Sequence, residues 1–253
     1  MSSREQKNKP DNIKMILIII LSIVVVISAL VAIFVNLNNS AGSVPANQSD
    51  NTETVLVNET ANSKNIEAKI TELILNYRKA FATGDIDTLA KIYNTDQVMD
   101  ADNIIATANI IKGYENTKCY IKEGNEENTY VAFVYDDLNI VDVDTLVPNL
   151  TYVYVMQKSD GSYYIYPGEY DTENSRYSFS NEIQSHIGKL IAAEDINNLY
   201  TDVNEKFIKL CEENEDLKKF MQKISDISDE TRSSEEEPAT TETISQTDTG
   251  EGN

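Results

Sequence analysis

The chain of 253 residues contains no tryptophan, one histidine and two cysteines. So few cysteines exclude a disulfide-rich scaffold, and without a Cys-x-x-Cys pair they also exclude a zinc site built on such pairs. None of the nine glycines belongs to a phosphate-binding loop or a Gly-x-Ser-x-Gly nucleophile elbow. We therefore expect no metal, no cofactor and no enzymatic activity.

The two cysteines can be interpreted in two ways. Cys119 lies in a strand-like run and Cys211 on the apolar face of a predicted helix. In an oxidising compartment they could form a disulfide, although the sequence does not determine connectivity. Two partly buried thiols that pack as small apolar groups are the favoured interpretation.

Basic residues are scarce, with 21 Lys and Arg against 42 Asp and Glu and a formal net charge of −21. An acidic surface repels the phosphates of nucleic acids and anionic lipid headgroups, so neither is an expected partner. The charge by itself indicates solubility more strongly than it indicates any basic partner.

One apolar run, Met15–Val35, stands out from this polar background. A helix needs about 20 apolar residues to cross a bilayer, so the run predicts one membrane-spanning helix. Arg4, Lys7, Lys9 and Lys14 precede it and no basic residue follows until Lys64, which predicts a cytoplasmic N-terminus in the plasma membrane. A cleaved signal peptide is the alternative, but such apolar regions are shorter, at about 7–15 residues.

The remaining sequence divides into segments on either side of this helix. Residues 1–14 form the predicted cytoplasmic N-terminus, and residues 36–63, rich in Asn, Ser and Thr, a flexible linker. Residues 64–225 have the length of a single domain, which the predicted topology places outside the cell. Residues 226–253 have nine acidic residues and no aromatic one, and we expect a disordered acidic tail.

Hydrophobic periodicity predicts that the domain begins with three helices. Apolar residues recur at helical spacing over 66–81, where Gly84 is the expected stop, and Asp85 is the expected cap of a short second helix. A third helix is expected over 104–111, ended by Gly113.

An antiparallel sheet of about four strands is expected next, because the pattern changes to β-branched and aromatic residues. The strands are expected at 118–122, 129–135, 151–156 and 162–166. Residues 138–143 either extend the second strand or form another, and Ser159-Asp160-Gly161 is a hairpin signal.

Helices are expected again after the sheet, which makes the fold class α+β. Ser180 is the expected N-cap of the first, and a break is expected near Ala193. Beyond it an apolar residue recurs every seven positions, at Ile196, Val203, Leu210, Leu217 and Ile224. Charged residues interrupt the intermediate positions, so a helix packed on its own sheet is favoured over a coiled-coil dimer.

Four segments carry a resemblance to a known family: Tyr77–Asp85, Tyr114–Lys122, Asp144–Tyr154 and Asp160–Ile165. Together with the order of elements, they resemble the nuclear-transport-factor-two-like (cystatin-like cone) domain. More narrowly, they resemble uncharacterised membrane-anchored extracytoplasmic proteins of clostridial bacteria. The resemblance implies helices packed on a curved sheet that can hold a ligand. Its members include isomerases, dehydratases, small-molecule binders and scaffolds, so the fold does not specify an activity.

The candidate ligand-binding residues are four tyrosines of the predicted sheet, Tyr152, Tyr154, Tyr164 and Tyr166. Strand alternation places each pair on one face, where the rings either contact a ligand or pack under helices; packing is favoured. His186 has no identifiable carboxylate partner and is not expected to be catalytic. Four aspartates within 136–144 resemble a calcium loop only weakly, and a solvated cluster is favoured.

The resulting expectation is a non-catalytic binding or interaction module of the bacterial cell envelope, with an envelope protein or a small ligand as its partner. An enzyme or small-molecule receptor that uses the sheet pocket is the first alternative, and it requires an interior carboxylate with a raised pKa. A dimerising assembly subunit is the second. The oligomeric state does not follow from the sequence.

Overall fold

The computed structural model describes residues 56–172 and 176–223, with side chains from residue 63 onward. The predicted membrane helix, most of the predicted linker and almost all of the predicted tail lie outside these ranges. No helix in the described part of the chain is long and apolar enough to cross a bilayer.

Helix α2 (Leu56–Thr83) begins the described structure, so the last eight positions of the predicted linker are helical. It ends at Gly84, whose φ of +62° suits glycine, as the sequence predicted. Helix α3 (Ile86–Tyr93) follows at once, and the Asp85 carboxylate accepts a hydrogen bond from Thr88 N at 3.0 Å. The predicted N-cap of the second helix is therefore confirmed.

Helix α4 (Ala101–Ala108) is shorter than the pattern predicted. Ile111 and Gly113 belong to strand β1 (Ile111–Glu123), so the prediction that Gly113 ends the helix was wrong. Ile111 pairs with Ile140 and is 4% exposed. Its burial on the sheet outweighs the helical spacing that it shares with Ile104.

The main sheet has the antiparallel order β1-β2-β3-β4. Strand β2 (Thr129–Ile140) includes residues 138–140, so the sequence beyond 135 extends the second strand. Strands β3 (Val147–Gln157) and β4 (Tyr163–Tyr166) flank the hairpin, where Gly161 has a φ of +83°. The α+β class and a four-stranded antiparallel sheet are thus confirmed.

Two short strands, β5 (Glu169–Asp171) and β6 (Arg176–Ser178), form a separate hairpin that the sequence did not reveal. Helix α5 (Asn181–Ala192) has the expected Ser180 cap, and Ala193 separates it from α6 (Glu194–Glu213). Asn214 interrupts the predicted seven-residue repeat, and its side chain accepts a hydrogen bond from Leu217 N as a second helical stretch begins.

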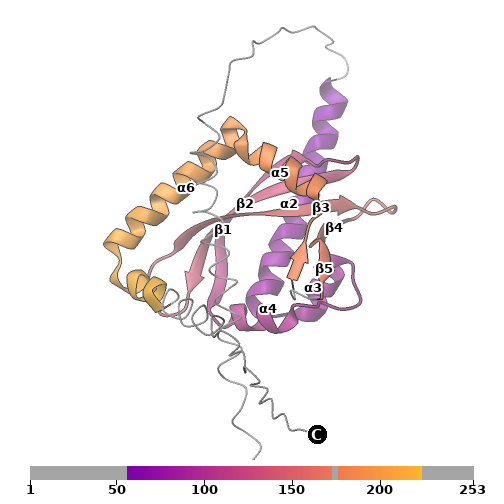
Figure 1. The fold of residues 1–253 in the computed structure, drawn as a ribbon. Coiled ribbons are helices and arrows are strands. Elements are labelled where there is room, and N and C mark those ends of the chain that lie inside the picture. Colours follow the sequence, from indigo (N-terminus) through magenta and orange to yellow (C-terminus); the bar gives the residue numbers. More distant parts are fainter. Residues whose placement is uncertain (1–55, 173–175, 224–253) are drawn as a thin grey trace, which may run out of the picture.

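The sheet lies between two layers of helices (Figure 1). Helices α2, α3 and α4 cover one face, where Ala132, Val134, Val153 and Val155 are buried. Helices α5 and α6 cover the opposite face. A third apolar cluster joins the Ile111 end of β1 to Leu217 after the Asn214 break.

Candidate functional site

The four candidate tyrosines lie on a single face of the sheet, the one that α5 and α6 cover. Tyr154 is the cross-strand partner of Tyr166, and Tyr164 is the partner of Met156 two residues further along β3. Directly paired residues share a face, and so do residues two apart along a strand. As predicted, Tyr152 and Tyr154 share one face of the sheet, and so do Tyr164 and Tyr166. The register shows in addition that the two pairs lie on the same face.

These aromatic rings pack against other side chains of the domain. Tyr154 is 1% exposed, and its hydroxyl hydrogen-bonds Asn125 Oδ1 at 2.6 Å and Thr129 Oγ1 at 2.9 Å. Phe179, immediately before α5, lies 6.0–6.5 Å from the rings of Tyr152, Tyr154 and Tyr166. The aromatic layer is thus a junction between β3, β4 and the segment that leads into α5.

A buried ion pair lies on the opposite face of the sheet, under α2. Arg78 Nη2 approaches Asp136 Oδ2 to 2.6 Å, and the two side chains are 8% and 0% exposed. The same nitrogen donates to Thr151 Oγ1 at 2.6 Å, while Thr117 Oγ1 donates to Asp136 Oδ1 at 2.8 Å. The Tyr114 ring lies 4.6 Å from the guanidinium carbon. One helix and three strands therefore converge on a charged pair.

Burial shapes the electrostatics of this pair. Desolvation raises the pKa of the Asp136 carboxyl, although the attraction of Arg78 acts in the opposite direction. Burial alone would lower the pKa of Arg78, but Asp136 and Tyr114 outweigh it and raise that pKa. Asp136 Oδ2 contacts Arg78 as an ion pair, and neither this oxygen nor Arg78 Nε has a further hydrogen-bond partner among the described residues.

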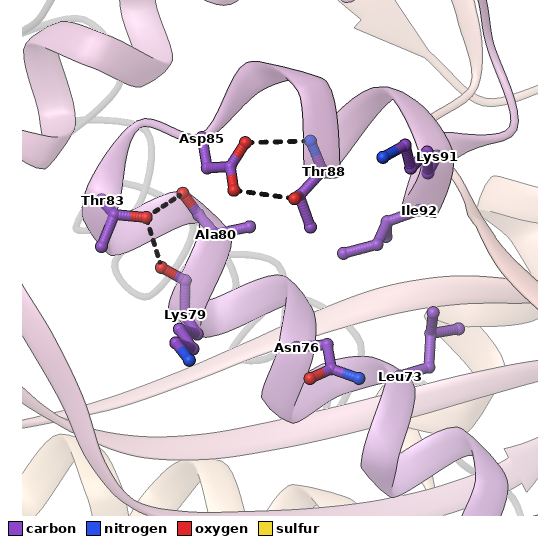
Figure 2. Close-up of a pocket in the computed structure, with 9 residues that line it drawn as sticks. All are labelled: Leu73, Asn76, Lys79, Ala80, Thr83, Asp85, Thr88, Lys91 and Ile92. Atoms are coloured by element: carbon purple, nitrogen blue, oxygen red, sulfur yellow. Dashed lines mark hydrogen bonds between the residues drawn. The ribbon is translucent and has the colours of Figure 1, made fainter.

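The strongest candidate for a ligand site is an open groove between α2 and α3, with a volume of about 380 Å³ (Figure 2). Its walls come from consecutive turns of α2 and from α3 across the Gly84 corner. The residues that line it are Leu73, Asn76, Lys79, Ala80, Thr83, Asp85, Thr88, Lys91 and Ile92.

The polar groups of the groove fall into two sets. Thr83 Oγ1 donates to the carbonyls of Lys79 and Ala80, and Asp85 Oδ2 accepts from Thr88 Oγ1 at 2.7 Å. These hydrogen bonds stabilise the corner between α2 and α3. No hydrogen bond or ion pair within the described structure engages the ammonium groups of Lys79 and Lys91. The groove therefore has two lysines without an ion pair among the described residues, one carboxylate that Thr88 engages, and apolar lining from Leu73 and Ile92.

The acidic residues of 136–144 do not converge. Asp136 is buried with Arg78, Asp137 accepts from Asn116 at 2.7 Å, and Asp144 accepts from Asn214 at 2.9 Å. In the described ranges no three His, Cys, Asp or Glu side chains are placed to bind a metal ion.

His186 and the two cysteines also lie apart from the groove. His186 Nε2 lies 3.0 Å from the carbonyl oxygen of Glu123 at the end of β1. Cys119 packs on the cluster under α2, whereas Cys211 packs on the cluster around Leu217, and both are free thiols.

Sequence reasoning missed both the groove and the buried pair. The available signal for the pair was Arg78 within the apolar stripe of α2, one turn after Ile74, because a buried arginine requires an acidic partner. The partner, Asp136, is 58 positions away and becomes identifiable only once strand register is known. Comparison of the chain with protein-family models, curated proteins and solved structures gives no match.

Proposed function

We propose that this protein is a single-pass plasma-membrane protein that presents an α+β domain outside the cell and binds a component of the cell envelope without transforming it. The groove between α2 and α3 is the proposed binding site. The anchor rests on the Met15–Val35 run, and the cone-like fold rests on the resemblance described above.

The filled interior is the observation that carries this proposal. An enzyme of the expected kind needs an interior acid beside an open cavity. Asp136 is interior and has a raised pKa, but Arg78 lies against it and apolar side chains fill the face around it. The open groove on the surface lies elsewhere, and its one carboxylate, Asp85, is exposed and hydrogen-bonded to Thr88.

The chemistry of the groove favours an anionic ligand. Lys79 and Lys91 provide two cations, one from each helix, and Asn76 of α2 provides an amide. Leu73 and Ile92 supply apolar lining, and Figure 2 shows them on the same side of the view as Lys91. A polymer or metabolite with a carboxylate or phosphate group and a small apolar part would complement this arrangement.

The proposed site is tested with full-length protein immobilised in detergent and exposed to an envelope extract. The anionic material that it retains is measured for the wild type and for Lys79→Ser/Lys91→Ser. Lys206→Ser/Lys209→Ser, on exposed positions of α6, removes the same charge elsewhere. The groove variant should lose retention and the α6 variant should keep it. Equal retention by both variants would exclude the groove.

Membrane topology is tested separately. An epitope after residue 253 should be digested by protease added to intact cells, and an epitope before Met1 should be protected. A protected C-terminal epitope, or release of the domain from the membrane without added protease, would contradict the anchored arrangement.

Asp136 supports a second candidate function, catalysis by an interior acid. Its raised pKa is the property that the enzyme alternative requires. Under the binding proposal, Asp136→Asn should leave retention of the envelope ligand unchanged in any variant that remains folded. If the wild type instead turns over a retained ligand and Asp136→Asn does not, the enzyme alternative replaces the binding proposal.

A further inference from the structure

Strand β1 is an edge of the main sheet, and half of its backbone groups face away from β2. Gly124 N donates to Thr129 O, so residues 124 and 129 form a hydrogen-bonded pair of the antiparallel ladder. Residues that bond to the neighbouring strand alternate with residues whose N–H and C=O groups point outward. Because the pairing with β2 is regular from Lys118 onward, Cys119 and Ile121 present their backbone groups at the open edge.

A slot of about 280 Å³ lies at this part of the edge. Residues 119–122 form one wall, and Glu67 and Thr71 of α2 and Asp195 of α6 line the rest. Among residues 56–172 and 176–223, no strand pairs with β1 on this side. Backbone donors and acceptors along such a slot can bind an extended segment by strand addition.

Both ends of the slot are limited, and this sets the length of the segment that it can accept. At one end, His186 Nε2 lies 3.0 Å from the Glu123 carbonyl oxygen. At the other end the register shifts just before Lys118, where Asn116 has a φ of +51°. A bulge of this kind bends the strand and interrupts pairing. The regular and unobstructed stretch is therefore 118–122, which suits an occupant of about five residues.

The side chains of this stretch that point toward α6 carry the available positive charge. Lys122 forms an ion pair with Asp195, whereas Lys118 is exposed and has no ion pair with any described residue. Tyr120, between the two lysines, is 38% exposed. A complementary segment therefore carries a carboxylate at the Lys118 end and an aromatic side chain beside Tyr120.

The side chains that point toward α2 have the opposite preference. Cys119 and Ile121 pack on the apolar cluster under α2, and the Glu67 carboxylate lies at the wall of the slot. This carboxylate disfavours a second acidic residue on the α2 side. Uncharged β-branched residues fit this row, so the complementary segment carries its negative charge at a single position.

A second copy of β1 complements this slot poorly. In a symmetric antiparallel pair centred on Tyr120, Lys118 of each copy would lie opposite Lys122 of the other, and like charges directly opposite are destabilising. Moving the centre by one residue in either direction extends the pair into one of the two obstructed ends. The charge pattern therefore favours an occupant with a different sequence.

We propose that β1 binds an extended segment of another protein by strand addition, with a carboxylate beside Lys118, an aromatic residue beside Tyr120 and β-branched residues toward α2. The segment runs antiparallel to β1, and backbone hydrogen bonds to Cys119 and Ile121 attach it. This site is separate from the α2–α3 groove, so the inference does not depend on the ligand of that groove.

The test uses full-length protein in detergent and the peptide Thr-Val-Tyr-Val-Glu-amide, which carries fluorescein on a flexible N-terminal linker. In the antiparallel register its glutamate lies opposite Lys118, and its two valines lie opposite Cys119 and Ile121. Fluorescence anisotropy should show saturable binding. N-methylation of both valines removes the amides that bond to β1 and should weaken binding by about tenfold or more. N-methylation of the tyrosine, whose amide points away from β1, is the matched control and should leave binding unchanged.

A charge exchange tests the position of the carboxylate. Lys118→Glu should weaken binding severalfold, and a peptide with lysine in place of its glutamate should restore binding to this variant. Lys112→Glu, an exposed position of β1 outside the slot, should have no effect.

Three results would overturn the proposal. The first is the absence of saturable binding, and the second is an equal effect of the two N-methylated peptides or of the two lysine variants. The third is protection of the Cys119 and Ile121 amides from hydrogen exchange that rises with protein concentration in the absence of peptide, because it would identify a second copy as the occupant.

Discussion

Replacing Arg78 by methionine tests how the helix layer is attached to the sheet. The change keeps most of the apolar length of the side chain but removes the cation that lies 2.6 Å from a carboxylate with no exposure. Loss of one partner from a buried pair typically costs about 3–5 kcal/mol, because the remaining charge stays buried and unpaired. We expect a loss of that size at pH 7.

The loss of stability caused by Arg78→Met should depend on pH, because it leaves the Asp136 carboxyl without its cation. Desolvation raises the pKa of Asp136, and removal of Arg78 takes away the attraction that opposes this rise. A group with a raised folded-state pKa contributes stability that is fully present below its unfolded pKa and is lost as the pH rises through the folded value. The penalty of Arg78→Met should therefore shrink as the pH falls from 7 toward about 4, where unfolded aspartate titrates.

The measurement is urea unfolding of the full-length protein in detergent, followed by circular dichroism at both pH values. Lys209→Met is the matched control, because Lys209 and Glu213 are 3.9 Å apart and 72% and 64% exposed. It should change the free energy of unfolding by less than about 0.5 kcal/mol. Arg78→Met/Asp136→Leu should recover most of the lost stability, which distinguishes an unpaired charge from a general packing defect. A single-variant penalty as small as the control, or one that grows at low pH, would refute the reasoning.

The remaining predictions concern the aromatic layer and two chain corners. Tyr154→Phe should lower the free energy of unfolding by about 1–2 kcal/mol in urea unfolding, because Asn125 and Thr129 lose their buried partner. An unchanged free energy of unfolding would mean that water replaces the hydroxyl in the variant. The pKa of Asp85 lies below its ordinary value of 3.8 because of hydrogen bonds from residue 88, so Asp85→Ala should destabilise at pH 7, and the difference from wild type should disappear as the pH falls through that lowered pKa. Gly168→Ala should reduce the melting temperature, because φ is +100° and a Cβ would lie 2.4 Å from a backbone oxygen of β6.

Local features of the fold could be predicted from the sequence because their causes lie within a few residues. The Asp85 and Ser180 caps, the Gly84 stop and the Gly161 turn depend on near neighbours, and the structure contains all four. Ile111 was misassigned because its burial depends on Ile140, which only the strand register brings beside it.

The candidate sites were less predictable for the same physical reason. Alternation within β3 and β4 correctly grouped the four tyrosines in pairs, but their joint position under α5 depends on a hairpin register and on Phe179. The α2–α3 groove follows from the angle at which two helices meet, and no short motif encodes that angle. The buried pair required a contact between a helix and a strand that are distant in the sequence.

The two helical layers come from opposite ends of the domain sequence, and this order has a consequence for biosynthesis. Helices α2, α3 and α4 precede the sheet and can cover one face as β1–β4 are made. Among residues 56–172 and 176–223, the segments that cover the face carrying Phe133 and Tyr154 all follow the sheet, up to Val203 of α6. A nascent chain that ends before α6 lacks part of the layer that covers this aromatic face, so we expect the face to stay exposed until α6 is made. We therefore expect the layer of α5 and α6 to complete the core of the domain last.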